Sequence, residues 1–412
     1  AAAKQIYTEG LESTKGGGIF RTLQDLAQKD QTGGNKYTNV FYTGAVDLYG
    51  STDAIWHDWI IACLDGNSPC NNKTDDFRKY VINKGLIGVV TAYVTYEMGV
   101  AIWKAADGQT TDGGAAYNWD EAAAFHIGRK DLDFSVYTIG GTTTPGSLYS
   151  PWEFNWKRDA DFPNGVMTHA HAPPIFNHGL LNLRGNSYNA AAVQAAQTQM
   201  YKIYAITAIR SAIKYGWKAY GSGSFSDKYL AEGALYWRSA SGYLSTFNKT
   251  TVQEIDAIFD LNKTTFTLQD ACDVKTKVES LYEAANISCK EVGTWKGVEA
   301  GTCLESSCTP DGDDTLSDGD GNYVSGCVAE TLADSTFTFL SDKLYCPVND
   351  VREHADTNKD VAAVAARLKE DPVNYEAAKT IYTEGLESSK GSGLRTLQDL
   401  AKGDKTSGGK YT

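Results

Sequence analysis

The sequence lacks the short motifs that mark the common enzyme and nucleotide-binding classes. It contains no phosphate-binding G-x4-G-K-[ST] loop, no dinucleotide fingerprint, no nucleophile elbow and no zinc-protease helix. It also lacks an excess of basic residues, because 38 Lys and Arg face 51 Asp and Glu and leave a net charge of −13. Such a chain has no cationic stripe for nucleic acid or an anionic membrane. We therefore expect a protein that is not an enzyme and has no nucleic-acid partner.

Metal-binding or redox C-x-x-C pairs are absent too, although the chain has eight cysteines. An even number without that motif is typical of disulfides in a protein outside the cytoplasm. Four N-x-[ST] sequons point the same way, because their glycosylation accompanies secretion. We expect a secreted glycoprotein of the periplasmic space, cell wall or extracellular surface. The predicted disulfide cysteines are Cys63, Cys70, Cys272, Cys289, Cys303, Cys308, Cys327 and Cys346, and the predicted glycosylation sites are Asn72, Asn248, Asn262 and Asn286.

The sequence has no initiating Met and no signal peptide, which fits a processed or excised chain. Long apolar runs are scarce as well. The longest, Gly85 to Trp103, is about long enough to span a bilayer but contains Glu97. We expect a buried core helix here and no membrane span in this segment.

The chain opens and closes with nearly the same stretch. Ala2 to Thr38 reads AAKQIYTEGLESTKGGGIFRTLQDLAQKDQTGGNKYT, and Ala377 to Thr412 repeats it with one deletion beside the glycine run. Similarity at a fixed period is typical of tandem repeats, so we expect neighbouring repeats as partners. The predicted organisation is a helical module at 1–290, a Cys-rich acidic subdomain at 291–350, a helical linker at 351–376 and the start of the next tandem repeat at 377–412.

Apolar residues recur at helical spacing in two long segments, and each is followed by a Gly-rich loop and a shorter helix. The two units, about 77–130 and 188–245, match at Trp103 with Trp217 and at Phe125 with Tyr236, which suggests an internal pseudo-duplication. Five prolines between Thr138 and Gly185 favour a long loop packed over the bundle. The predicted fold class is mainly α, a bundle-like helical core with a disulfide-rich irregular subdomain.

An anion site is predicted at the first glycine loop. Lys15, Gly16 to Gly18 and Arg21 lead into a helix whose start at Thr22 has a capping-box pattern. Free backbone N–H groups, a helix dipole and a guanidinium are the ingredients of an anion site. A flexible connection between two helices is at least as good an interpretation.

A metal site is predicted in the block DLYGSTDAIWHD, which combines carboxylates, a phenol and an imidazole. On a helix that starts at Asp53, the one-turn spacing would place Asp53 and His57 on one face. With Asp47 and Tyr49 they form a hard donor set that suits Fe(III). From spacing alone, an aspartate at a helix terminus that pairs with its own histidine is the favoured alternative.

Two matched glutamates, Glu121 and Glu232, lie among alanines and small residues in the internal repeats. A carboxylate on such a face is expected to be buried and to need a partner. It can serve as a ligand or hydrogen-bonding hub of the bundle, or form a structural ion pair with Lys104 or Lys218.

Half of the six histidines fall in the segment THAHAPPIFNH. An H-x-H pair with a third histidine seven residues on can bind Zn, Cu or Ni when its loop folds back, but no flanking carboxylate supports this. These weaker candidates are His169, His171 and His178.

An acidic stretch from Asp311 to Asn322 resembles a calcium loop in its D-x-D-x-N spacing. Tyr323 and Ala329 occupy the positions where an EF-hand needs Gly and Glu. A solvated acidic turn is the preferred interpretation, and weak Ca binding is the second.

Three sequence blocks together resemble the low-iron-inducible periplasmic (iron-assimilation) proteins of algae, a family related to the phytotransferrins. They are IYTEGLESTKGGG with RTLQDLA, FYTGAVDLYGSTDAIWHDWI, and the paired WDEAAAFHIG and LAEGALYWR segments. The resemblance covers most of Ala2 to about Ala285. It implies an extracellular or periplasmic protein that binds ferric iron with carbonate as a synergistic anion.

Carried over to this chain, the resemblance implies Asp47, Tyr49, Asp53 and His57 as iron donors and Arg21 with Thr22 as the anion site. The Glu9-x-x-Glu12 pair matches an E-x-x-E pattern proposed for iron in such proteins. The leading function is therefore cell-surface capture of a metal ion, ferric iron above all. The alternative is a structural tandem-repeat glycoprotein of a cell wall, glycocalyx or extracellular filament.

Overall fold

The computed structural model describes most of the helical module and parts of the carboxyl-terminal region. Within the described residues the protein is mainly α-helical, as predicted. The described residues are 36–51, 54–128, 137–139, 142–144, 150–185, 188–298, 301–303, 345, 348, 351, 354, 361–362, 364–365, 367–370 and 372–384.

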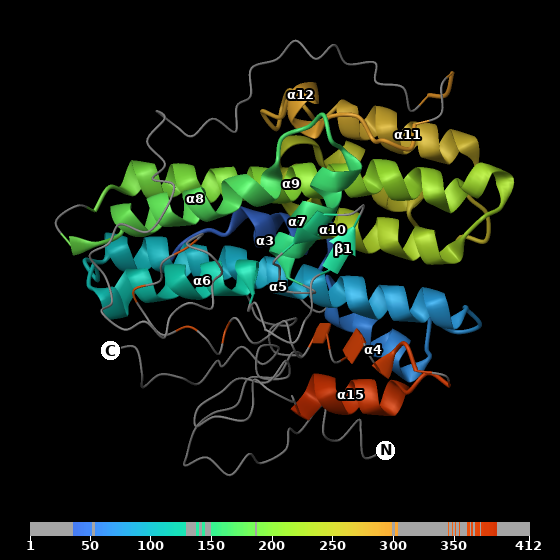
Figure 1. Cartoon of the computed structure of the whole chain (residues 1–412), viewed down its shortest axis with the longest axis horizontal. Coiled ribbons are helices and arrows are strands. Elements are labelled where there is room, and N and C mark those ends of the chain that lie inside the picture. Colours follow the sequence, from blue (N-terminus) through green and yellow to red (C-terminus); the bar gives the residue numbers. More distant parts are fainter. Residues whose placement is uncertain are drawn as a thin grey trace.

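Long helices form the centre of the fold (Figure 1). Helix α10 packs along α9 and crosses both α5 and α3, while α6 packs on α5. Their bounds are α3 Val40–Tyr49, α5 Asp75–Ala106, α6 Tyr117–Ile127, α9 Ala190–Tyr220 and α10 Asp227–Ile258.

Shorter elements cover this centre. Helix α4 packs on α5, α7 and α8 pack on α9 and on each other, and α11 packs on α9 and α10. Strands β1 and β2 form an antiparallel hairpin in which Tyr137 pairs with Thr144. The bounds are α4 His57–Asp65, η1 Asp112–Ala116, β1 Tyr137–Ile139, β2 Thr142–Thr144, α7 Pro151–Asp161, α8 Thr168–Asn182, η3 Gly221–Gly223, α11 Leu268–Glu279, α12 Cys289–Val292 and α15 Tyr375–Glu384.

Helix α5 illustrates why these segments are helical. The Thr74 side chain accepts a hydrogen bond from the backbone N–H of Phe77, and Asp75 and Asp76 oppose the dipole in the first turn. Within the described residues α5 alone is long and apolar enough to cross a membrane, and 89% of its most apolar window is buried in the fold. This burial agrees with the predicted core helix.

The crossing of α3 and α10 depends on two glycines. A Cβ on Gly44 would overlap the backbone oxygen of Gly242, and a Cβ on Gly242 would overlap the backbone oxygen of Phe41. The two backbones therefore approach more closely than any larger residue allows. This contact holds α3 and its terminal Tyr49 against α10.

The prediction of a long loop between Thr138 and Gly185, based on its five prolines, is wrong, because α7 and α8 lie in this segment. Pro151 occupies the first turn of α7, where its missing N–H costs nothing. Pro173 lies inside α8 and leaves the carbonyl of His169 without its helical donor. The indole N–H of Trp152 donates to that carbonyl at 3.0 Å instead.

Disulfides join Cys63 with Cys70 and Cys272 with Cys303, and Cys289 is also disulfide-bonded. These findings confirm disulfide use for five of the predicted cysteines; Cys308, Cys327 and Cys346 lie outside the described residues. The asparagines of all four sequons are exposed, so the sites are accessible, and their glycosylation stays a prediction.

The division at residue 290, the internal duplication and the linker also stay predictions. Val361, Val364 and Leu368 of the predicted linker belong to the same buried core as α5. Most of the predicted Cys-rich subdomain lies outside the described residues.

Candidate metal and anion site

The predicted iron donors lie in different surroundings. Asp47 is exposed on α3, and its carboxylate lies 2.6 Å from the ammonium of Lys249. Tyr49, the last residue of α3, donates to Asp256 at 3.1 Å. His57 is buried at the start of α4, and this burial lowers its pKa to about 4.

Arg238 organises the chain around Tyr49. Its guanidinium carbon lies 3.8 Å from the ring centroid of Tyr49 and 3.5 Å from that of Trp59. Its Nη1 donates to the backbone oxygens of Ala54 and Ile55 at 3.2 and 3.3 Å. The block that was predicted to bind a metal thus wraps around an arginine cation.

The carboxyl of Asp256 completes this contact. Burial raises its pKa to about 6, although Arg238 and the bond from Tyr49 oppose the rise. Burial, and then the charge of Asp256, raise the pKa of Tyr49. The phenol therefore stays protonated at neutral pH and acts as a hydrogen-bond donor.

Helix α4 begins at His57, so the one-turn spacing from Asp53 does not fall within a helix. The side chain of Asp53 lies outside the described residues, as do Lys15, Arg21, Thr22, Glu9, Glu12 and the acidic stretch from Asp311. In the part of the chain that the structure describes, no three His, Cys, Asp or Glu side chains are placed to hold a metal ion.

The three histidines of THAHAPPIFNH lie on α8 and do not form a cluster. His169 and His171 are two residues apart on a continuous helix, so they point to different sides. Asp159 accepts from the backbone N–H of His169 at 2.9 Å and contacts its ring Nδ1 at 2.5 Å. His178 lies beside Asn182, 3.4 Å from its amide nitrogen.

Glu121 is buried, as expected, and it contacts groups from distant parts of the chain. Its Oε1 lies 2.8 Å from Nε2 of His354, far away in the sequence. Asn118 donates to Glu121 at 3.2 Å and to Glu97 at 2.6 Å, so the two carboxylates share one amide. Burial lowers the pKa of Lys104 although both carboxylates oppose that change.

Glu232, the other matched glutamate, is also buried, and it faces a different set of side chains. Its Oε1 lies 3.8 Å from the ammonium of Lys84. Tyr236, one turn further along α10, stacks on Phe154 with ring centroids 4.0 Å apart, and Tyr215 of α9 stacks on Tyr236 at 5.5 Å. Burial, followed by the charge of Glu232, raises the pKa of Tyr236.

Arg158 of α7 lies among these groups. Its guanidinium carbon is 5.2 Å from the ring centroid of Tyr215 and 5.8 Å from that of Tyr236. Nη2 contacts the carboxylate of Asp161 at 3.1 Å. Burial alone would lower the pKa of Arg158, but Tyr215, Asp161, Tyr236 and Glu232 together raise it, so the cation is permanent.

The guanidinium is incompletely hydrogen-bonded. Only 4% of the Arg158 side chain is exposed, and neither Nε nor Nη1 has a hydrogen-bond partner among the described residues. A buried unsatisfied donor costs about 1–3 kcal/mol, and more when it is charged. We call Arg158, Tyr215, Glu232 and Tyr236 the Tyr–Arg cluster.

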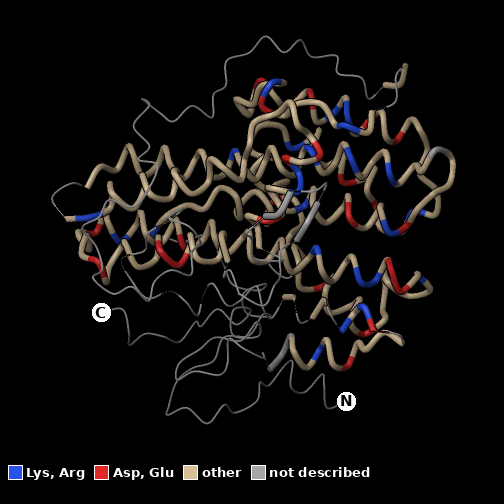
Figure 2. The backbone as a smooth tube through the Cα atoms, viewed as in Figure 1, with Lys and Arg blue, Asp and Glu red and all other residues tan. Residues whose placement is uncertain are grey.

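Three helices bring the Tyr–Arg cluster together. Helix α7 contributes Arg158, α9 contributes Tyr215, and α10 contributes Glu232 and Tyr236. Figure 2 shows basic and acidic positions close together where α7 lies against α9 and α10, whereas α8 carries neither kind. The sequence patterns singled out Glu232 and Tyr236 but missed Arg158 and Tyr215, which no motif marks.

The described site therefore holds two phenols, a carboxylate and an arginine with unused donors.

Comparison with known proteins is limited to the family level, since no curated protein and no solved structure matches the chain. The model of a family described as low iron-inducible periplasmic protein matches residues 1–314, which is well over half of the sequence. The chain belongs to the low iron-inducible periplasmic protein family.

Proposed function

We propose that this protein captures ferric iron together with a small oxyanion such as carbonate, and that the Tyr–Arg cluster is the binding site. The single observation that carries the proposal is the buried guanidinium of Arg158, whose Nε and Nη1 have no hydrogen-bond partner among the described residues. Membership of the family makes the protein iron-related and periplasmic or secreted. Capture of iron, and the role of an anion, are our inference.

The chemistry of the cluster suits this cargo. A guanidinium presents paired N–H donors in a plane that fits a carboxylate-like or carbonate oxyanion. Fe(III) is a hard cation that prefers phenolate and carboxylate oxygens, which Tyr215, Tyr236 and Glu232 supply. The pKa of both phenols is raised by burial, so their protons leave only when a strong cation replaces them.

An anion beside the iron would also balance charge. Arg158 and a trivalent ion in one buried site would repel each other, and a divalent oxyanion between them removes that repulsion. The same anion would accept hydrogen bonds from Nε and Nη1. Iron and anion are therefore expected to bind together, each weakly without the other.

The sequence-based donor set stays a second hypothesis for the same function. Asp47, Tyr49, Asp53 and His57 would have to exchange the observed contacts of Asp47 with Lys249 and of Tyr49 with Asp256 for metal bonds. The predicted anion site at Lys15, Arg21 and Thr22 stays a prediction as well.

Ferric titration of the purified chain, with and without bicarbonate, tests the proposal. Phenolate bound to Fe(III) gives a visible charge-transfer band, so binding and tyrosine ligation are read together. We expect the band in the wild type and a loss of its intensity in Tyr215→Phe and Tyr236→Phe. In Arg158→Met we expect iron to bind at least ten-fold more weakly, and we expect bicarbonate no longer to affect that binding.

Tyr49→Phe is the matched control, because it removes one partly buried phenol from the other candidate site. It is expected to keep the band. If the wild type binds no iron at micromolar concentration, the proposal is wrong. If Tyr49→Phe loses the band while Tyr236→Phe keeps it, the iron binds at the sequence-based donors instead.

A structural role in a tandem-repeat glycoprotein is the second candidate function. It is favoured by the repeated opening stretch and by the exposed asparagines of the four sequons. Intact-mass analysis of the secreted protein shows whether the sequons carry glycans. An unglycosylated mass together with tight iron binding would favour iron capture over the structural role.

A further inference from the structure

Helix α15 contains the first residues of the second copy of the repeated stretch. Ala377 to Glu384 reads AAKTIYTE, and Ala2 to Glu9 reads AAKQIYTE, so the two differ at one position. In the structure, α15 lies beside α4 (Figure 1). The start of the second copy therefore packs on the module that precedes it.

The contacts of α15 are polar at one side and apolar at the other. Lys379, with a side chain that is 7% exposed, lies 2.8 Å from the carboxylate of Asp65 at the end of α4. Ala378 and Ile381 are buried and belong to the same core cluster as the residues of α5. This ion pair places Lys379 of α15 against the end of α4.

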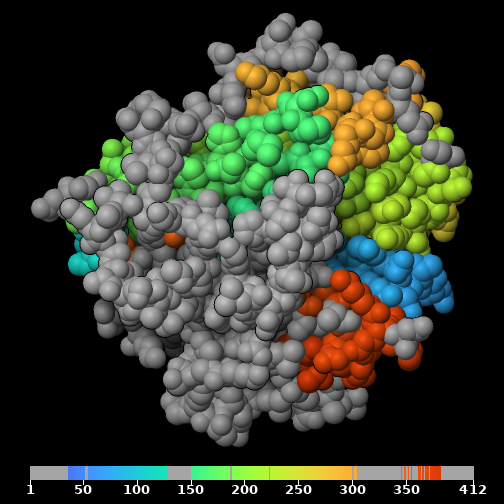
Figure 3. Space-filling view, in the orientation of Figure 1, coloured from blue at the N-terminus to red at the C-terminus, as the bar shows by residue number. Residues whose placement is uncertain are grey.

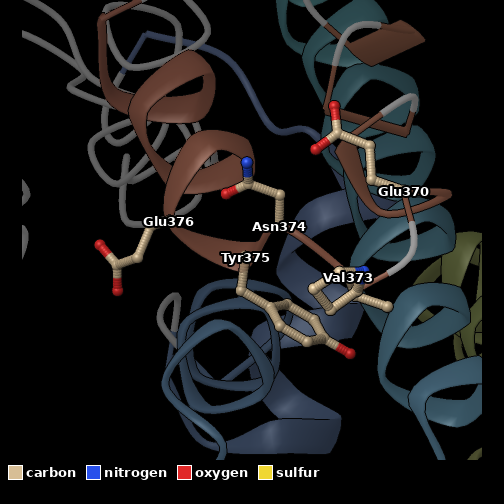
Figure 4. Close-up of a pocket in the computed structure, with 6 residues that line it drawn as sticks. Glu370, Val373, Asn374, Tyr375 and Glu376 are labelled. Carbon is tan, nitrogen blue, oxygen red and sulfur yellow. The ribbon is translucent and has the colours of Figure 1, made fainter.

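Tyr375, two residues before the repeat, strengthens this attachment. Tyr375 donates to the carboxylate of Asp75 at 2.8 Å, and the guanidinium of Arg78 stacks on its ring at 3.7 Å. Figure 4 shows the ring of Tyr375 directed toward the neighbouring helices while Glu376 points away, beside a surface pocket lined by Glu370 and residues 372–376. In Figure 3 the orange-red surface, which includes α15 and the described residues of 361–370, lies beside the blue surface of α5.

We infer that the surface formed by α4 and the start of α5 is a docking site for the helix that opens a repeat. Its occupant is the sequence AAK-x-IYTE of a following copy of this module. The first copy carries every docking residue that the repeat itself supplies, because Ala3, Lys4 and Ile6 correspond to Ala378, Lys379 and Ile381. Successive modules are thereby interlocked, since each module is completed by the first helix of the next.

This attachment has a mechanical consequence. A junction made by a flexible linker would let neighbouring modules rotate freely. A shared helix that contributes Ala378 and Ile381 to the preceding core instead gives the junction a fixed geometry. The structural boundary between modules then lies after α15, beyond the boundary that the repeat marks in the sequence.

Peptide binding to the full chain tests this inference. We call the variant that carries Lys379→Glu and Ile381→Asp the released chain. In it, repulsion between residue 379 and Asp65 and the loss of the apolar contact of Ile381 are expected to detach α15. The released chain also carries Ile6→Asp, so that its own first copy does not compete. A fluorescent peptide of residues 1–12, AAAKQIYTEGLE, is expected to bind this chain at micromolar concentration and the wild-type chain at least ten-fold more weakly, because α15 fills the site.

Charge reversal shows whether the peptide uses the same contacts. Asp65→Lys is added to a released chain that carries Lys379→Ala instead of Lys379→Glu, so that residue 379 cannot pair with the introduced lysine. It is expected to abolish binding of the natural peptide and to restore binding of the peptide with Lys4→Glu. Failure of the natural peptide to bind the released chain, or binding that ignores these charge changes, overturns the inference.

A variant of the intact chain keeps the test decisive if the released chain does not fold. Asp65→Lys alone is expected to speed amide hydrogen exchange in residues 375–384, and Lys379→Glu added to it is expected to restore protection. Equal exchange in the single and double variants contradicts the proposed docking.

Discussion

Because His57 is buried, we expect this residue to make the free energy of unfolding decrease in acid. The side chain is buried at the start of α4, and desolvation lowers its pKa from 6.5 to about 4. In the unfolded chain the imidazole takes up a proton near pH 6.5, whereas the folded chain resists it until about pH 4. The contribution of neutral His57 to stability is therefore complete above pH 6.5 and is lost as the pH falls toward 4.

The magnitude follows from the two pKa values. Linkage gives a loss of about 2.5 kcal/mol in the free energy of unfolding between pH 7.5 and 4.5 from this residue alone. Other groups titrate in the same range, so the quantity to measure is the difference between the wild type and His57→Gln at each pH. That difference is expected to shrink by about 2.5 kcal/mol on acidification, because glutamine does not titrate.

Guanidinium chloride denaturation at pH 7.5 and 4.5, followed by circular dichroism, measures this change. The matched control is His171→Gln, which removes a histidine that is only partly buried in α8. An equal difference between wild type and His57→Gln at the two pH values would refute the assignment of His57 as a buried neutral residue. It would favour a charged role, such as the pairing with aspartate considered from the sequence.

Three further predictions concern the scaffold. Gly242→Ala is expected to destabilise the fold by about 1–3 kcal/mol, seen as a lower Tm, because the new methyl group overlaps the backbone of Phe41. Thr267→Ala is expected to cost about 1 kcal/mol in denaturation, because it removes the capping box of α11; an unchanged midpoint would contradict this. Burial raises the pKa of Asp256 to about 6, so the contribution of this residue to stability falls as the pH rises through 6. Asp256→Asn keeps an acceptor for Tyr49 and is expected to remove that contribution. Denaturation at pH 5 and 8 measures the difference in the free energy of unfolding between wild type and variant, and an equal difference at the two pH values would contradict the prediction.

Local sequence patterns predicted the main helices well. The apolar periodicity of residues 77–106 and 188–220 corresponds to α5 and α9, since a helix that buries one face must repeat its apolar residues at that spacing. Cys63 and Cys70, both predicted to be in disulfides, are joined to each other. Such features depend on neighbours in the chain, so the sequence contains the required information.

The proline-rich segment shows where local reasoning fails. Pro173 removes a helical hydrogen bond, and that rule is correct, yet Trp152 of another helix supplies the missing donor. The compensating group is about twenty residues away in sequence and comes from α7, so no local pattern could reveal it. The same applies to Asp53 and His57, whose predicted pairing assumed a helix that in fact begins at His57.

The sequence by itself determined that this is a mainly helical, disulfide-bonded member of an iron-related periplasmic family with a repeated opening stretch. Only the tertiary structure decided which side chains meet. It placed Arg158 against Tyr215, Tyr236 and Glu232 from three helices, and it enclosed Arg238 between Tyr49 and Trp59. The reason is physical: periodicity and caps are local properties of a chain, whereas the burial of these side chains, and with it their pKa shifts and unsatisfied donors, depends on how distant helices pack.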